Sequence, residues 1–167
     1  MDVQYLITEA NISKGCNRGM NQLIHAKTEQ DFINCYFDNI DFCLSKDFPE
    51  NDYIKKIQNP LQSAGVFVDC KRVLKNPDRL VLLGKCDFEV EFTDFAVSRV
   101  YVKHESMLII KASGNSFVVV DALNNSNVHV TCRDKARVVV NLYSKANCTG
   151  ATKIIAKNAE TYDLQTE

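Results

Sequence analysis

Residues 85–144 consist of six consecutive segments of ten residues: KCDFEVEFTD, FAVSRVYVKH, ESMLIIKASG, NSFVVVDALN, NSNVHVTCRD and KARVVVNLYS. A seventh, weaker copy begins at Lys145, and Gly150 stands at its sixth position, where the other copies carry a branched apolar residue. Repetition at a fixed period is typical of proteins that stack identical units, so this stretch decides the fold.

The even positions of the repeat predict a strand with one buried face. Positions four, six and eight are mostly apolar and position two is always small, whereas the odd positions vary. Alternating side chains share one face of a strand, so the even positions point inward. The small second position predicts a tight corner, where Asn, Gly and Asp adopt the left-handed conformation. We expect the sixth positions to form one interior stack: Val90, Val100, Ile110, Val120, Val130 and Val140.

One copy is too short to close a coil. Ten extended residues span about 33 Å, and facing walls must lie about 10 Å apart. Two copies are long enough, which predicts a flattened, two-sided β-solenoid of about 20 residues per coil and about three and a half coils. An antiparallel meander with ten-residue steps is the alternative, but it does not require ladders of like residues.

Before residue 65 the apolar residues recur at helical spacing. A short helix is expected around Met20–Ile24, and one longer helix from Thr28 to Leu44, with Thr28 and Asp31 as its capping box. A third helix is expected to start at Pro49. The fold class is therefore α+β, with a helical segment at 1–64, a β-solenoid at 65–157 and a polar tail at 158–167 that is loose or ordered only by a partner.

The odd positions of alternate copies should lie on opposite outer faces of the coil. One of these faces is apolar in its middle, and such a surface should be covered, either by the helical segment or by another subunit. The candidate interaction residues on it are Val97, Tyr101, Phe117, Val119 and Val139.

The opposite face carries Asp87, Glu89 and Glu91 on one strand. Paired carboxylates carry out glycoside hydrolysis in other proteins. In a chain this short, with no deep cleft implied, a solvated strand edge that resists further stacking is the preferred explanation of these residues. The three histidines lie far apart in the sequence, and the seven cysteines lack CxxC spacing (His25, His104, His129; Cys16, Cys35, Cys43, Cys70, Cys86, Cys132, Cys148). We therefore expect reduced thiols and no catalytic residue, metal site or cofactor.

Composition narrows the class of partner. The chain has 167 residues and a net charge of −1, which disfavours nucleic-acid binding by bulk charge. Its longest apolar runs are far shorter than the roughly 20 residues of a membrane-spanning helix, and Met1–Ala10 does not resemble a secretory signal. We expect synthesis in the cytosol, and a virion as a further location.

Five segments of the chain carry a resemblance to other proteins: Ile40–Cys43, Phe48-Pro49, Tyr53–Lys56, Gly65–Asp69 and Val100–His104. They resemble a group of small uncharacterised proteins from Bacteroidetes and their bacteriophages. The resemblance implies a helical N-terminus before a decapeptide β-solenoid, and a role in a phage virion or tail. It carries no catalytic signature.

The sequence thus predicts a non-enzymatic structural and interaction protein. Its partner would be a second copy or another virion component, with no nucleic acid or membrane involved. Two alternatives remain: a polymer-forming solenoid like the bactofilins, and a carbohydrate-binding or carbohydrate-acting protein that uses Glu89 and Glu91.

Overall fold

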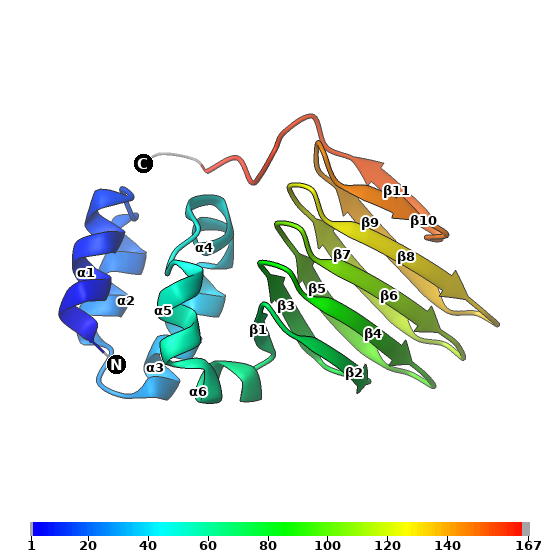
Figure 1. The fold of residues 1–167 in the computed structure, drawn as a ribbon, viewed down its shortest axis with the longest axis horizontal. Helices are drawn as coiled ribbons and strands as arrows, with labels where there is room; N and C mark the ends of the chain where they lie inside the picture. The colour runs from blue at the N-terminus through cyan, green and yellow to red at the C-terminus, as the bar shows by residue number, and fades with distance from the viewer. Residues whose placement is uncertain (1, 165–167) are drawn as a thin grey trace. The chain divides into compact units, whose positions relative to one another are not determined.

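The computed structural model describes residues 2–164, and the chain divides into two compact units (Figure 1). The helical unit runs up to Ala64 and also includes residues 162–164. The second unit, the solenoid, spans Gly65–Thr161.

The helical unit is built from short helices. Their bounds are α1 (Val3–Ile12), α2 (Asn17–His25), α3 (Glu29–Asp38), α4 (Ile40–Lys46), α5 (Asn51–Lys56) and α6 (Gln58–Ser63). Each buries one or a few apolar side chains, such as Leu6 of α1 and Ile54 of α5. The third predicted helix therefore begins at Asn51 rather than at Pro49.

The predicted capping box at the start of α3 is confirmed. The Thr28 hydroxyl accepts the Asp31 N–H at 3.1 Å, and the Asp31 carboxylate accepts the Thr28 N–H at 2.9 Å. The single helix predicted from Thr28 to Leu44 is wrong, because the chain leaves helical geometry at Asn39 (φ −122°, ψ 35°). The Asn39 amide donates to the Cys35 carbonyl at 2.8 Å, and asparagine favours such local bonds over a continuous helix.

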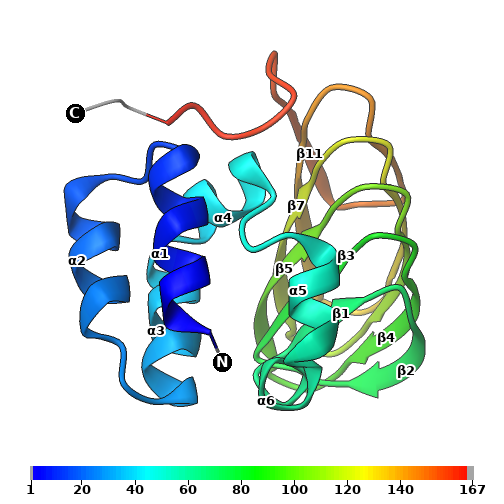
Figure 2. The ribbon, with the colours of Figure 1, turned by 60° about the vertical axis from the view of Figure 1, so that its left-hand side comes forward.

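The solenoid consists of two parallel sheets that face each other (Figure 2). Sheet A has the order β1-β3-β5-β7-β9-β11, and sheet B has the order β10-β8-β6-β4-β2. The strands are β1 (Val66–Val68), β2 (Lys71–Lys75), β3 (Arg79–Leu83), β4 (Asp87–Phe92), β5 (Val97–Val102), β6 (Met107–Ala112), β7 (Phe117–Ala122), β8 (Asn127–Cys132), β9 (Arg137–Leu142), β10 (Asn147–Thr149) and β11 (Lys153–Ala156). The α+β fold with a two-sided solenoid is confirmed, and the antiparallel meander is excluded.

The strand register shows a coil of 20 residues through the repeat. Val100 lies opposite Val120, and Val120 lies opposite Val140, all in sheet A. The expected single stack of sixth positions is wrong in one respect, because alternate copies belong to opposite sheets. Val90, Ile110 and Val130 form a second column in sheet B, and both columns contribute to one buried core.

The corners follow the predicted chemistry. The tenth position of the repeat has positive φ in five successive copies, at Asp94, His104, Gly114, Asn124 and Asp134. Glycine adopts this conformation freely, and Asn, Asp and His are the other residues enriched in it. The small second position directly precedes each strand and is mostly buried, as the narrow corner requires.

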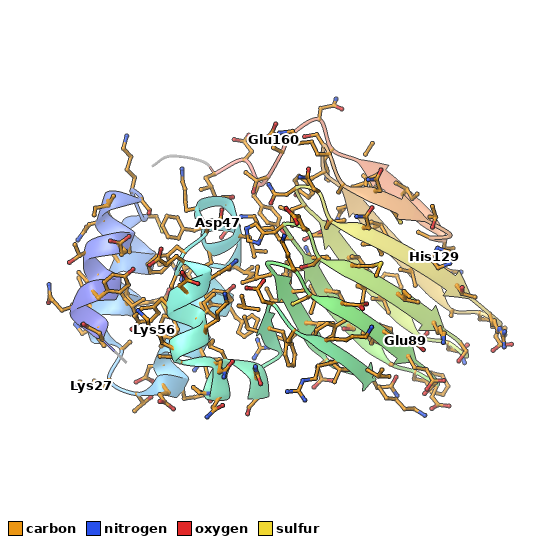
Figure 3. The ribbon with its side chains drawn as sticks, viewed as in Figure 1. Lys27, Asp47, Lys56, Glu89, His129 and Glu160 are labelled. Atoms are coloured by element: carbon orange, nitrogen blue, oxygen red, sulfur yellow. The ribbon has the colours of Figure 1, made fainter. Side chains whose placement is uncertain are left out.

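The two ends of the solenoid depart from the repeat. At the N-terminal end, β2 is an edge strand with exposed Lys71, Arg72 and Lys75, and it lacks the apolar alternation that would have predicted it. At the other end, Ser144 donates its N–H to the Ala159 carbonyl at 2.9 Å. Lys145 pairs with Glu160 at 2.7 Å (Glu160 is labelled in Figure 3).

Residues 158–161, the first part of the predicted tail, contact the last corner of the solenoid through these two bonds. From Tyr162 the chain joins the helical unit, where the Tyr162 carbonyl accepts from the Ser45 hydroxyl at 3.4 Å. Residues 165–167 of the predicted tail lie outside the described residues.

Candidate interaction face

The five predicted interaction residues lie together on the outer face of sheet A. Val97 of β5 is in register with Phe117 of β7, and Val119 of β7 is in register with Val139 of β9. Tyr101 lies on β5, at an odd position like Val97. Because odd positions share one face of a strand, these side chains form neighbouring ladders.

The most exposed apolar side chains of this face gather at the start of β5 and β7. Val97 is 67 % exposed, and Phe117 is 38 % exposed. Phe95, at the corner two residues before Val97, is 79 % exposed. Three large apolar residues left in water at neighbouring positions are unfavourable unless a partner covers them. We call Phe95, Val97 and Phe117 the apolar patch.

Sequence reasoning missed Phe95, although a signal was present. The first position of the other copies is polar or charged in every case: Lys85, Glu105, Asn115, Asn125, Lys135 and Lys145. A lone phenylalanine at this corner position was therefore the exception to explain.

Beside the apolar patch lies an ordered polar network. The Arg99 guanidinium bonds to one oxygen of the Asp121 carboxylate at 2.8 Å, and the Asn141 amide donates to the other oxygen at 2.5 Å. The guanidinium carbon of Arg99 also lies 5.5 Å from the centroid of the Tyr101 ring. These contacts hold the middle of the face in one arrangement. Tyr101 and Asp121 are buried there, so the predicted interaction residue Tyr101 is not exposed, and the accessible part of the face is the apolar patch.

The three carboxylates of the opposite face are each paired with a lysine from a neighbouring strand. Asp87 pairs with Lys71 at 2.6 Å, Glu91 pairs with Lys75 at 3.9 Å, and Glu89 pairs with Lys111. The bond to Asp87 raises the pKa of Lys71 above its ordinary value. Glycoside hydrolysis uses two carboxyl groups whose environments differ, so that one is protonated and the other is charged. Here all three carboxylates have the same kind of environment, an ion pair with a lysine on a neighbouring strand of β2, β4 and β6. The arrangement favours a structural role for the acids.

The histidines serve separate local bonds. His104 accepts the Gly84 N–H at 3.0 Å through Nδ1, and His129 bonds to the Thr149 hydroxyl at 2.7 Å. Figure 3 labels Glu89 and His129 on the strands of sheet B. Within residues 2–164, no group of three or more His, Cys, Asp or Glu side chains is arranged to hold a metal ion.

The helical unit has a small cavity of about 30 Å³ among α2, α3 and α4, lined by side chains that include Cys16, Met20, Cys35 and Phe42. That volume holds one or two water molecules and is too small for an organic ligand. Burial raises the pKa of the Cys35 thiol to about 11, which makes it a poor nucleophile at neutral pH.

No protein-family model matches this chain, and neither the curated proteins nor the solved structures gave a significant match. In the part of the chain that the structure describes, no helix has both the length and the apolar content needed to cross a bilayer. Function is therefore inferred from the arrangement of the residues.

Proposed function

We propose that this is a non-enzymatic structural and interaction protein, a component of a larger assembly such as a bacteriophage virion or tail. The observation that carries the proposal is the apolar patch, which the chain leaves in water on a rigid, ladder-built face. A β-solenoid is consistent with a structural role because its long, regular faces change little when a partner binds. The phage setting rests on the sequence resemblance.

The apolar patch suits a protein partner better than a small ligand. Aromatic side chains are enriched at the centres of protein interfaces, and Phe95 and Phe117 provide two of them. Arg137 lies in register with Phe117 and supplies a polar rim to the patch. An apolar centre with a charged rim is the usual anatomy of a protein–protein interface.

A charge placed in the apolar patch tests this role. Phe117→Lys should remove the protein from purified virions, or abolish its self-association, because an ammonium group would be buried in the interface without a partner. Met107→Lys is the matched control, since Met107 is 45 % exposed and begins β6 on the opposite outer face. Quantitative mass spectrometry of the particles and light scattering of the pure protein measure the two outcomes. Equal behaviour of the two variants would contradict the assignment of this face.

Growth by end-to-end stacking, as in the bactofilins, is the second candidate, because one end of the solenoid leaves its core open. Ile154 continues the column of Val120 and Val140, and it is 44 % exposed. The other end opposes stacking, since charged side chains on an edge strand prevent strand addition and β2 exposes Lys71, Arg72 and Lys75. Light scattering separates the two: a mass independent of concentration supports a closed assembly, and concentration-dependent filaments support stacking.

The carbohydrate alternative is tested on sheet B. Glu89→Gln and Glu91→Gln should bind and hydrolyse glycans no differently from the wild-type protein, because both carboxylates are paired with lysines. A glycan whose binding or hydrolysis these variants abolish would replace the structural role with a carbohydrate-directed one.

A further inference from the structure

Two cysteines meet at the corner where the N-terminal edge strand of sheet B begins. Cys70 directly precedes β2, and Cys86 directly precedes β4. The next residues of the two segments, Lys71 and Asp87, are in parallel register, and the Asp87 N–H donates to the Cys70 carbonyl at 3.0 Å. Cys70 and Cys86 are therefore lateral neighbours, with Cα atoms about 4.8 Å apart as in any sheet. Disulfides form at Cα separations of about 4.4–6.8 Å.

The side chains of this pair lie on the same, inner side of sheet B. Cys86 belongs to the buried core cluster and Cys70 packs against that cluster, so both side chains point into the coil. The Cys86 Sγ lies 3.2 Å from the Leu83 carbonyl oxygen. The other two cysteines of the solenoid have different neighbours, since Cys148 lies opposite Val128 and Cys132 lies opposite Ala112. The juxtaposition is thus particular to the first corner of sheet B.

We propose that Cys70 and Cys86 form a reversible disulfide that ties the edge strand β2 to β4. With a small disulfide such as oxidised glutathione as the oxidant, the Cys70 thiolate attacks one of its sulfurs and releases one glutathione thiolate. The Cys86 thiolate then attacks the Cys70 sulfur of the mixed disulfide and releases the second glutathione. Two protein thiols lose two protons and two electrons, and the glutathione disulfide is reduced to two thiols.

Exposure sets the order of the two steps. Cys70 is half-buried and can meet the oxidant, whereas Cys86 is only 2 % exposed and reacts only with its neighbour. Burial raises the pKa of Cys86 to about 11. The rate at which Cys86 attacks the mixed disulfide should therefore rise about tenfold for each unit of pH between 7 and 9, because the thiolate fraction of Cys86 rises in that proportion.

The bond would act on the weakest part of the solenoid. Strand β2 has a neighbour on one side only, and its side chains are mostly exposed. Cross-linking it to β4 removes conformations from the unfolded chain and opposes fraying of the edge. The oxidised protein should melt several degrees higher than the reduced protein.

The experiment incubates the full chain with oxidised glutathione and counts thiols by mass spectrometry after denaturing alkylation. We expect two fewer of the seven thiols to react, and peptide mapping to join Cys70 to Cys86. Cys86→Ser removes the thiol that attacks the mixed disulfide. Cys70 should therefore keep its bound glutathione, and no disulfide should form within the chain. This variant is compatible with the fold because Ser106 and Ser126 occupy the same corner position in the following coils.

Cys148→Ser is the matched control. Cys148 is also half-buried in the solenoid, and its loss should leave the Cys70–Cys86 bond and the rise in melting temperature unchanged. Oxidation that leaves all seven thiols reactive, or a bond that maps to another pair such as Cys16 and Cys35, would overturn the proposal.

Discussion

Ser106 and Ser126 occupy the same corner of two successive coils, and both are fully buried. The Ser106 hydroxyl donates to the Gly84 carbonyl at 3.1 Å and accepts the Cys86 N–H at 3.2 Å. Among the described residues, the Ser126 hydroxyl has no hydrogen-bond partner. A buried polar atom without a partner costs about 1–3 kcal/mol, so two identical residues contribute to stability with opposite sign.

Alanine at these two positions should therefore have opposite effects. Ser126→Ala should raise the free energy of unfolding by about 1 kcal/mol, since it removes an unsatisfied hydroxyl. Ser106→Ala should lower it by about 1 kcal/mol, since it leaves the Cys86 N–H unpaired. Urea unfolding of the two variants measures both values. A loss of stability in both variants would show that the Ser126 hydroxyl is satisfied in the folded protein.

Gly150 shows why a repeat pattern alone is a poor guide to single residues. It stands where valine or isoleucine stands in the other copies, so the pattern favours a branched side chain there. Its φ is 77°, and a Cβ atom would lie only 1.9 Å from the Val130 carbonyl oxygen. The backbone itself fills the space that the side chain would need.

Gly150→Val should therefore destabilise the solenoid by at least about 2 kcal/mol, although it restores the repeat. Asn147→Val, at an exposed position of the same strand β10, is the control, and it should change the free energy of unfolding little. Thermal unfolding followed by circular dichroism compares them. A Gly150→Val protein as stable as the wild type would place this residue in ordinary extended geometry.

At the scale of elements, the start of α3 makes stability depend on pH. The neighbouring Thr28 side chain and the hydrogen bonds that the Asp31 carboxylate accepts from the Lys27 and Thr28 N–H groups lower the pKa of Asp31 below the ordinary 3.8. A group whose pKa is lower in the folded state stabilises that state above pH 3.8, and this contribution is lost as the pH falls through the folded-state pKa.

Asp31→Asn should reduce the stability of the helical unit at pH 6, because the charged cap is lost. The difference from the wild type should shrink as the pH falls below about 4. Urea midpoints measured from pH 6 to pH 2 follow the change. A difference that stays constant over this range would mean that the Asp31 charge does not stabilise α3.

The elements that could be predicted are those with a strong local signal. The capping box fixed the start of α3, and the alternation of apolar residues identified β4 to β9. Strand β2 was missed because an exposed edge strand has no buried face to produce alternation. The break at Asn39 was missed because the apolar spacing continues across it. The helix ends there where the Asn39 side-chain amide donates a hydrogen bond to the Cys35 carbonyl.

For the whole molecule, the coil of two copies followed from length alone, since ten residues cannot enclose a core. The location of the five interaction residues on one outer face followed from the same argument. Phe95 had one signal, as the lone apolar residue at the first position of the repeat, whereas the side-by-side placement of Cys70 and Cys86 had none. Both features lie at corners, where side-chain direction depends on backbone angles that a period of ten does not specify.

The central claim is that strands 20 residues apart are neighbours, and nuclear Overhauser effects on the isotope-labelled protein test it most directly. Backbone contacts should link β5 to β7 and β7 to β9, for example through Val100, Val120 and Val140. Backbone contacts between β5 and β6 should be missing, because these strands belong to sheets that face each other about 10 Å apart. Strong backbone contacts between Arg99 and Ile109, ten residues on, would contradict the solenoid and the interaction face built on it.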